Sequence, residues 1–427
     1  MLKIGIIGSG PSGLYAIDSL LKSSLPTPFA IDVFEKLPTP YGLLRGGVAP
    51  DHLKIKNLES FFEKALTHPF VRFFGNVTVG QTISVEVLKA HYHALIFCYG
   101  AEGHQQLNVP CEDLKGCWSS KHFVGFYNSH PDDEGLDIDL SGQDAVIIGQ
   151  GNVALDVARL LAKSDKERQQ SDMHSYPLSV FSKSRIRNIH LVGRRGPVYM
   201  ACTDHELEEL TQLSDCQLKI CPEDLILNAE DEHYLNSNTK AQKNISILKR
   251  ALEGSSGNPS KNIIFHFNLS LTKILGKTHV NELIFTNQKT HKEHYFPCQL
   301  LIKSVGYKGL KMPGLAFDEE KGIVPNQHGK VEEGIYVAGW IKRGANGVIG
   351  MNKKCSQETV DTLVASLSNL SPISMDIVSF LKEQSIRYVT FDEWQKINEY
   401  EKKKGISLGK PREKCSKITQ MLSLLNP

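Results

Sequence analysis

Residues 2–13 have the sequence LKIGIIGSGPSG, and residues 144–154 have the sequence DAVIIGQGNVA. In each stretch a short apolar run, typical of a buried parallel strand, leads into a glycine-rich turn and then into helical spacing. The first glycine of such a unit permits a tight turn, the second lets the backbone approach a pyrophosphate, and the third lets the helix pack on the strand. The free N–H groups of the helix N-terminus favour the negative charge. Two such units predict an α/β fold with two Rossmann-like dinucleotide-binding domains.

The residues that follow the two turns differ in charge. Glu35 ends the strand after the first turn, about 20 residues beyond Gly13, where a carboxylate accepts hydrogen bonds from a ribose 2′-hydroxyl and repels a 2′-phosphate. The second turn is followed by Arg194 and Arg195, whose guanidinium groups suit a 2′-phosphate through charge-assisted hydrogen bonds. The first site is therefore predicted to take FAD or NAD, and the second NADPH. Two dinucleotides in one chain indicate redox chemistry passed from one to the other.

The rest of the chain repeats the strand–helix pattern. The predicted strands are Ala30–Phe34, His93–Cys98, Asp144–Ile148, Asn188–Val192, Leu300–Val305 and Gly334–Ala338, with helices at Leu14–Lys22 and Leu155–Lys163. The polar stretch Asn228–Asn262 predicts a helix and a mobile loop. From Pro372 onward, helical patches are expected to alternate with Lys/Glu-rich linkers such as Glu401–Gly405.

Composition excludes several classes of protein. The chain has 427 residues, 41% hydrophobic, and a net charge of +2, which gives no nucleic-acid signature. No apolar run is long enough to span a bilayer. Because the first strand begins at Leu2, we expect no leader and a cytoplasmic, bacterial-type protein. The nine cysteines include no Cys-x-x-Cys pair, so we expect no zinc or iron–sulfur site and no other metal centre.

Several motifs together resemble one family. They are Gly42–His52 (GLLRGGVAPDH), Gly149–Arg159 (GQGNVALDVAR), Val192–Pro197 (VGRRGP), Gly339–Gly344 (GWIKRG), Gly347–Gly350 (GVIG) and Gly409–Lys414 (GKPREK). In this order and at these separations they resemble adrenodoxin reductase and the ferredoxin–NADP+ reductases of that type. The resemblance runs over essentially the full chain and is far more specific than either glycine turn.

The resemblance implies a glutathione-reductase-like pair of domains, with an NADPH domain inserted in a discontinuous FAD domain. The implied FAD contacts are Gly8, Gly10, Ser12, Gly13, Glu35, Leu43, Val79, Trp340, Gly347, Val348 and Ile349. The implied NADP contacts are Gln150, Gly151, Asn152, Val153, Arg194, Arg195, Glu206 and again Gly347. His52 and Asp156 match the family's paired histidine and aspartate near the flavin and nicotinamide, as catalytic positioning residues.

The chain departs from the family pattern at a few positions. Gly46 replaces an aromatic residue, Ala345-Asn346 replaces a Pro-Thr or Pro-Ser pair, and Met351 replaces a threonine. Glu208 stands where adrenodoxin-reducing members carry an arginine that meets the acidic ferredoxin. We expect compensating positive charge from a helix that carries four basic residues, Lys240, Lys243, Lys249 and Arg250.

These observations predict a ferredoxin–NADP+ reductase, an FAD-dependent oxidoreductase of electron transport that docks a small acidic iron–sulfur ferredoxin electrostatically. The FAD domain is expected at about 1–103 and 305–427, and the NADPH domain at about 104–304. Two alternatives remain open at this point. One is an NADPH-dependent flavoenzyme that serves flavodoxin, a quinone or an oxygenating chemistry. The other is a flavin-binding redox sensor without turnover.

Overall fold

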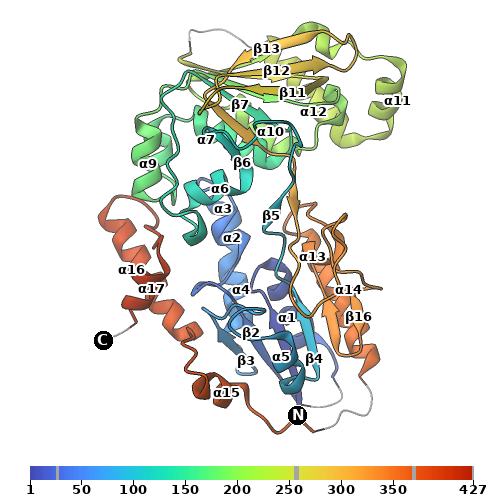
Figure 1. Cartoon of the computed structure of the whole chain (residues 1–427), viewed down its shortest axis with the longest axis vertical. Coiled ribbons are helices and arrows are strands. Elements are labelled where there is room, and N and C mark those ends of the chain that lie inside the picture. Colours follow the sequence, from blue (N-terminus) through green and yellow to red (C-terminus); the bar gives the residue numbers. More distant parts are fainter. Residues whose placement is uncertain (26–27, 254–258, 368–371, 426–427) are drawn as a thin grey trace. The chain divides into compact units, whose positions relative to one another are not determined.

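The chain forms two compact units, seen here in a computed structural model that describes residues 1–25, 28–253, 259–367 and 372–425. The first unit consists of Met1–Gly103 together with Gly306–Pro427, and the second of His104–Val305 (Figure 1). The first unit is therefore built from both ends of the chain, and the second is continuous. The assignment of the two units to FAD and to NADPH remains a prediction at this stage.

A six-stranded sheet forms the centre of the first unit. Its strand order is β16-β17-β4-β1-β2-β3. The strands are β1 (Leu2–Ile7), β2 (Phe29–Phe34), β3 (Val71–Phe74), β4 (Ala94–Phe97), β16 (Lys330–Glu332) and β17 (Ile335–Val337). All neighbours are parallel except β16 and β17, which form an antiparallel edge. The late strand β17 pairs with β4, so the chain completes its first sheet only after the second unit.

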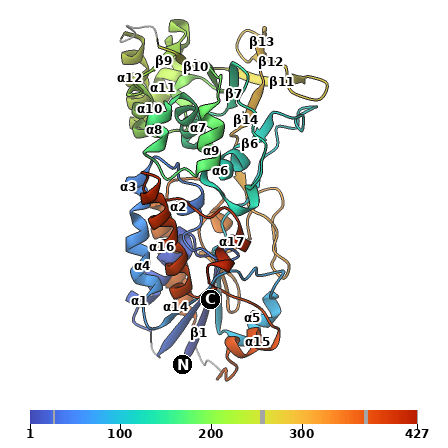
Figure 2. The same ribbon diagram turned by 90° about the vertical axis from the view of Figure 1, so that its left-hand side faces the viewer.

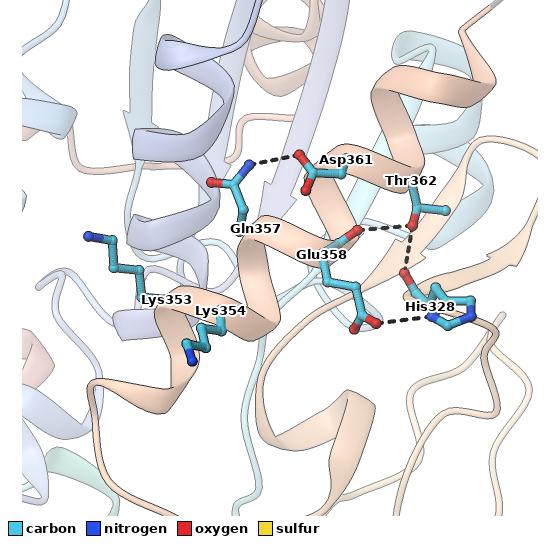
Figure 3. Close-up of a pocket in the computed structure, with 7 residues that line it drawn as sticks. All are labelled: His328, Lys353, Lys354, Gln357, Glu358, Asp361 and Thr362. Atoms are coloured by element: carbon cyan, nitrogen blue, oxygen red, sulfur yellow. Dashed lines mark hydrogen bonds and ion pairs between the residues drawn. The ribbon is translucent and has the colours of Figure 1, made fainter.

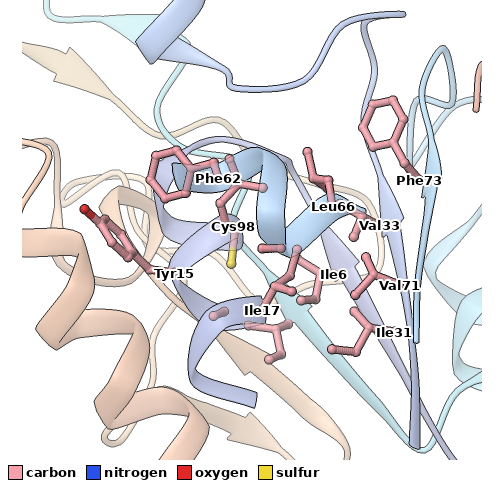
Figure 4. Close-up of a cluster of buried hydrophobic side chains, with 14 of the residues drawn as sticks. Ile6, Tyr15, Ile17, Ile31, Val33, Phe62, Leu66, Val71, Phe73 and Cys98 are labelled. Carbon is pink, nitrogen blue, oxygen red and sulfur yellow. The ribbon is translucent and has the colours of Figure 1, made fainter. Parts of the chain in front are cut away.

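Helices cover both faces of this sheet. They are α1 (Pro11–Lys22), α2 (Leu43–Gly46), α3 (Leu53–Lys56), α4 (Leu58–Leu66), α5 (Val85–His91), α13 (Trp340–Arg343), α14 (Met351–Ser366), α15 (Ile377–Glu383), α16 (Phe391–Ser407) and α17 (Ile418–Ser423). On one face Ile17 of α1 and Phe62 and Leu66 of α4 meet Ile6 and Val33 of the sheet (Figure 4). Burying each such side chain stabilises the fold by about 1.5–3 kcal/mol.

The predicted linker at Glu401–Gly405 is wrong, because these residues lie inside α16. Glu401 is fully buried, and its carboxylate accepts hydrogen bonds from both terminal nitrogens of Arg45 (2.6 and 2.9 Å) and from Arg412 Nη1 (3.0 Å). Burial alone would raise the pKa of the Glu401 carboxyl, but the two arginines hold it below its ordinary value. A run of charged residues predicts a solvated segment. Here Arg45 and Arg412 neutralise Glu401, so its burial becomes favourable.

This ion cluster ties the late helix α16 to early parts of the chain. α16 lies beside α4 (Figure 2), where Gln395 donates to Glu63 (3.1 Å) and Arg412 pairs with Glu59 (3.2 Å). Gly405 is required near the end of α16, since a Cβ there would lie 2.4 Å from the backbone of Arg412. The GKPREK segment thus folds back against the helix and supplies the second arginine of the cluster.

We expect Glu401→Gln to lower the free energy of unfolding by about 3–5 kcal/mol, because it removes the buried carboxylate that Arg45 and Arg412 share and leaves Arg412 with its pair to Glu59 at the edge of the cluster. Since the folded-state pKa of Glu401 lies below that of the unfolded chain, the wild type gains this stability above the unfolded pKa and loses it as the pH falls. Chemical denaturation at several pH values measures both effects. Glu399→Gln, on the exposed side of the same helix, is the matched control. Equal stability of the two variants would contradict the role of the cluster.

The second unit contains another parallel sheet, with strand order β6-β14-β7-β8-β10-β9. Its strands are β6 (Cys117–Ser119), β7 (Asp144–Ile148), β8 (Asn188–Val192), β9 (Cys216–Ile220), β10 (Lys261–His266) and β14 (Leu300–Lys303). A three-stranded antiparallel sheet, β11 (Leu269–Leu275), β12 (Glu282–Asn287) and β13 (Glu293–Pro297), packs through Leu283, Phe285 and Phe296 against the parallel sheet.

This unit has more helices than the sequence predicts. They are α6 (Ser120–Asn128), α7 (Asn152–Ala162), α8 (Asp165–Gln169), α9 (Ser175–Ser182), α10 (Asp204–Thr211), α11 (Ala229–Ser237) and α12 (Thr239–Glu253). The predicted strands β7 and β8 have the expected bounds. The polar stretch 228–262 forms two helices and the start of β10 where one helix was expected, and residues 254–258 of its predicted loop lie outside the described residues. The antiparallel sheet was not predicted.

Candidate functional site

The first glycine turn joins β1 to α1 and is shaped by close backbone contacts. Gly8 has φ +101°, and a Cβ on it would lie 2.7 Å from the carbonyl oxygen of Cys98. A Cβ on Gly13 would lie 2.1 Å from the carbonyl oxygen of Gly8, so only glycine lets the helix approach the strand. A Cβ on Gly10 would have its nearest neighbour 3.9 Å away, and no side chain caps the helix N-terminus there. The middle glycine therefore has room for a Cβ, with Gly42 as its neighbour, beside a helix N-terminus that favours negative charge.

The second turn, between β7 and α7, repeats this geometry. Gly149 has φ +125°, and a Cβ on it would lie 2.2 Å from the carbonyl oxygen of Ser304. Gly151 is the uncapped helix N-cap, and the atom nearest to a Cβ there is 3.9 Å away. Ala154, in the third position, is fully buried. In both turns the first and third positions are enclosed by protein, whereas the middle position has room for a Cβ.

Two of the predicted NADP contacts use their side chains within the protein. The Gln150 amide nitrogen donates to the carbonyl oxygens of His266 (3.0 Å) and Leu191 (3.3 Å). Asn152 Oδ1 accepts from the backbone N–H of Thr203 (2.9 Å). These side chains fix the loop, so the backbone of 150–153 remains available to a phosphate.

Glu35 lies where the motif predicts, at the end of β2. Its Oε2 accepts hydrogen bonds from Ser9 N (3.0 Å) and Ser9 Oγ (2.7 Å), and its Oε1 accepts from Leu37 N (3.2 Å). Burial raises the pKa of the Glu35 carboxyl, and these three hydrogen bonds oppose that shift. Ser9, a residue inside the glycine turn, therefore orients the carboxylate toward the turn.

Arg194 and Arg195 follow β8, and both are exposed. The Arg195 guanidinium lies over the Tyr199 ring, 5.4 Å from its centroid, and its Nη2 donates to the Tyr199 carbonyl oxygen (3.5 Å). Arg194 has no hydrogen bond or ion pair with any residue that the structure describes. The two cations are thus accessible, and one of them is oriented by an aromatic ring.

The remaining predicted FAD contacts come from three places in the first unit. Leu43 on α2 is 39% exposed, whereas Val79 is buried in a hydrophobic cluster beneath the sheet. Trp340 begins α13, and its indole N–H donates to the carbonyl oxygen of Asn346 (3.1 Å). Val348 is half exposed, and Ile349 packs against the core of the first sheet.

Gly347 and Ser12 lie on either side of the N-terminus of α14. Gly347 has φ +78°, and a Cβ on it would lie 2.1 Å from the sulfur of Met351. Ser12 donates from Oγ to Asn352 Oδ1 (3.1 Å), and its carbonyl oxygen accepts from Ser356 Oγ (2.8 Å). The structure therefore joins the 347–349 segment to the first glycine turn through the first two turns of α14.

His52 and Asp156, predicted as a pair, lie in different units. His52 is the N-cap of α3 and is partly buried. Asp156 lies in the second turn of α7, and Arg159 donates to it (2.7 Å) while also pairing with Glu209 of α10 (3.1 Å). Glu206 lies on α10, which packs against α7.

A surface pocket of about 610 Å³ lies along α14 (Figure 3). It is lined by His328, Lys353, Lys354, Gln357, Glu358, Asp361 and Thr362. His328 pairs with Glu358 (3.0 Å) and Gln357 donates to Asp361 (2.8 Å), so much of its polar lining is already satisfied. The sequence did not single out this pocket, and none of the predicted site residues lines it. Among the described residues, no group of three potential ligands suits a metal ion, and no helix is long and apolar enough to cross a membrane.

Two sheets that are parallel except at the β16–β17 edge, each with a glycine turn before an uncapped helix, define a protein of the paired-Rossmann class. Comparison with known proteins gives the family. No family model matches, but the chain is 37% identical to NADPH-ferredoxin reductase FprA of Mycobacterium tuberculosis, covering 99% of this chain and 98% of that protein. It is 35% identical to the mitochondrial NADPH:adrenodoxin oxidoreductase of Salvelinus fontinalis, covering 99% and 91% of the two chains.

The fold agrees with the sequence comparison. The structure of Mycobacterium tuberculosis FprA in complex with NADPH matches with a TM-score of 0.94 over 99% of both chains, at 37% identity. The chain belongs to the family of NADPH–ferredoxin and NADPH–adrenodoxin reductases, which are oxidoreductase enzymes. The predicted family, fold class and enzyme class are confirmed. The individual site residues stay predictions.

Some residues of the site escaped sequence reasoning. Ser9 and Tyr199 orient Glu35 and Arg195, and both lie within or next to the motifs. Arg343 and Asn352 contact the Trp340 and Ser12 segments. Arg343 lies within the GWIKRG motif and Asn352 just after GVIG, but neither motif assigned these side chains a role, because a polar residue in a helix has many possible roles.

Proposed function

We propose that the chain is an FAD-dependent NADPH–ferredoxin reductase, which moves a hydride from NADPH to FAD and passes electrons singly to a small iron–sulfur protein. When bound, FAD supplies the conversion between two-electron and one-electron transfer. The observation that carries the proposal is the pair of open glycine turns with opposite charges after them: a buried carboxylate in the first unit and two exposed arginines in the second.

In the first unit, the α1 N-terminus and the Gly10 backbone would hold the FAD pyrophosphate, with Glu35 accepting from the adenosine ribose. Trp340 and the 347–349 backbone would border the isoalloxazine. In the second unit, the α7 N-terminus and the 150–153 backbone would hold the NADPH pyrophosphate. Arg194 and Arg195 would hold the 2′-phosphate, since a planar guanidinium matches phosphate oxygens in pairs.

The direct test is NADPH-driven reduction of the bound flavin, followed by reduction of candidate acceptors. Bleaching of the visible flavin band by NADPH is expected, and its absence would favour the redox sensor without turnover. A panel of ferredoxins and flavodoxins, assayed at several salt concentrations, then identifies the acceptor. Reduction of flavodoxins alone would overturn the ferredoxin assignment.

Replacing Arg194 and Arg195 together with alanine is expected to weaken NADPH binding by about 2–4 kcal/mol, because charge-assisted hydrogen bonds to the 2′-phosphate are lost. NADH, which lacks that phosphate, should bind almost unchanged. Titration of both nucleotides measures the difference. Arg185→Ala, an exposed arginine before β8, is the matched control. An equal loss of affinity for NADPH and NADH would show that these arginines do not bind the 2′-phosphate.

We propose His52 and Asp156 as positioning residues for hydride transfer. Hydride transfer depends on alignment of the donor and acceptor rings more than on proton movement. His52 occupies the N-cap position of α3, after the GLLRGGVAP segment, and its backbone N–H donates to the carbonyl oxygen of Ala49 (3.0 Å), so its backbone is held in a fixed turn. Asp156 is held by Arg159, which fixes its carboxylate on the side of α7 that faces α10.

His52→Ala is expected to slow flavin reduction by NADPH about tenfold or more while FAD stays bound, because ring placement is lost and binding is not. Stopped-flow absorbance at saturating NADPH measures the rate, and the flavin absorbance of the purified variant measures retention. His328→Ala, a strongly exposed histidine in the same unit, should leave the rate unchanged. An unchanged rate in the His52 variant would exclude it from the mechanism.

We also propose that an acidic ferredoxin docks on the surface formed by α10 and α12. The expected basic cluster is partly neutralised within the protein: Lys243 pairs with Asp204 (2.8 Å) and Arg250 with Glu208 (2.5 Å). Lys240 donates to the carbonyl oxygens of Met200 (3.3 Å) and Ala201 (3.2 Å). Lys249 is exposed and has no ion pair with a described residue. α12 carries four basic residues and one acidic residue, Glu253, whereas α10 carries four acidic residues, among them Glu208. The positive charge is therefore confined to α12, and α10 offsets it.

If this surface binds the partner, Glu208→Gln frees Arg250 and should lower the KM for ferredoxin about two- to fivefold, the range expected from one exposed ion pair. Arg250→Glu should raise it, and both effects should shrink with added salt. Turnover with a small dye acceptor serves as the control and should not change. Identical ferredoxin kinetics in both variants would exclude α12 as the docking surface.

A further inference from the structure

Arg343 connects three segments of the first unit with side-chain hydrogen bonds. It is the last residue of α13, and a loop of residues 344–350 separates it from α14. Its Nη1 donates to the carbonyl oxygen of Asn346 (2.5 Å) and to Asn346 Oδ1 (2.8 Å). Its Nη2 donates to Asn352 Oδ1 (2.9 Å). One guanidinium group therefore fixes both the middle of the loop and the first turn of the following helix.

The two acceptors of Arg343 each accept a second hydrogen bond. The Asn346 carbonyl oxygen also accepts from the indole N–H of Trp340 (3.1 Å). Asn352 Oδ1 also accepts from Ser12 Oγ at the start of α1 (3.1 Å). We call the connected set Trp340, Arg343, Asn346, Asn352 and Ser12 the arginine clamp. It runs from the indole at one end to the first glycine turn at the other.

The loop inside the clamp needs such restraint. Residues 344–350 include Gly344, Gly347 and Gly350, and the proline that the family pattern would place at 345 is an alanine. Fixing the backbone of each residue costs about 1–2 kcal/mol of conformational entropy, and most for glycine. Here the two bonds from Arg343 to Asn346 hold the loop that a proline ring would otherwise stiffen.

The hydrogen bonds of Arg343 orient its guanidinium group, although one of its donors is left without an acceptor. Its Nε is buried and has no acceptor among the described residues, whereas both terminal nitrogens are engaged. A buried unsatisfied donor costs about 1–3 kcal/mol. Asn352, which receives the other arm, is itself buried. The guanidinium plane is thus set by two asparagine acceptors, one in the loop and one in the first turn of α14.

We propose that Arg343 is a positioning residue, which through Asn346 and Asn352 sets the Trp340 indole and the 347–349 backbone relative to the pyrophosphate-binding turn. This inference rests on the proposed function, in which Trp340 and the 347–349 backbone border the isoalloxazine and the turn holds the pyrophosphate. Its consequence is that loss of the clamp slows hydride transfer far more than it weakens NADPH binding, for which Gly347 is the one predicted contact in this unit.

The experiment compares Arg343→Lys, Asn352→Ala, their double variant and Asn352→Asp. Arg343→Lys keeps the charge but loses the planar fork, and Asn352→Asp keeps an oxygen acceptor. At saturating NADPH, Arg343→Lys and Asn352→Ala should each slow flavin reduction about tenfold, as expected for a small misplacement of reacting groups. The Kd for NADPH should stay within about twofold of the wild type. The double variant should be no slower than the slower single variant, and Asn352→Asp should restore the rate.

A second readout needs no cofactor. In the FAD-free chain, acrylamide quenching of Trp340 fluorescence, obtained by subtracting the signal of a Trp340→Phe variant, should rise in Arg343→Lys and Asn352→Ala. Gln357→Ala, an exposed change on the same helix, should alter neither rate nor quenching. The clamp would be excluded if the two rate effects multiplied in the double variant. It would also be excluded if neither the quenching nor the rate changed in Arg343→Lys and Asn352→Ala. If NADPH fails to reduce the wild-type flavin, the proposed function fails, while the quenching comparison still decides whether Arg343 orients Trp340.

Discussion

The two nucleotide turns depend on one physical constraint, a backbone-to-backbone approach that no side chain permits. At Gly13 and Gly149 an added Cβ would lie about 2 Å from a carbonyl oxygen of the same unit. At Gly13 the neighbour is Gly8 of the same turn, so α1 packs on the end of β1, whereas at Gly149 the neighbour is Ser304, which follows β14. Both helices begin without a side-chain cap, and each middle glycine has room for a Cβ. In the proposed function the helix end, and not a charged side chain, binds the pyrophosphate in both units.

In the proposed function, the residues after each turn add selectivity between nucleotides. The structure holds Glu35 and the arginine pair in different ways. Glu35 is buried and accepts two hydrogen bonds from Ser9 of the glycine turn and one from Leu37, so its position is fixed before any ligand arrives. Arg194 and Arg195 are exposed, and only Arg195 rests on an aromatic ring. A rigid carboxylate suits a cofactor that stays bound, whereas exposed arginines suit a nucleotide that enters and leaves in each cycle.

The sequence predicted most of the parallel framework and little of what surrounds it. The strands around both glycine turns were predicted because short apolar runs next to glycine have few alternatives, and β7 and β8 have the expected bounds. The antiparallel sheet at 269–297 was missed because its strands are half polar and no turn motif marks them. Glu401 was assigned to a linker because composition cannot show that Arg45, more than 350 positions earlier, neutralises it. Long-range pairing of charges leaves no local pattern.

The same difficulty applies to the site. Glycines, Glu35 and the arginine pair were predictable from spacing, and their places in the fold agree with that spacing. Arg343 and Asn352 were not, since their contacts depend on α14 lying against α1. Motifs identify where a cofactor touches the backbone, whereas the residues that orient a motif are found only when the elements are assembled.

The split of the first unit across the chain has a consequence for how the protein is made. β17, α14 and α16 all come after residue 334, and they complete a sheet and a core begun by the first hundred residues. On the ribosome the continuous second unit emerges whole and can fold while the first still lacks its closing strand, since domains generally fold as units during synthesis. We therefore expect the first unit to complete its fold last, once its late strand and helices have been synthesised.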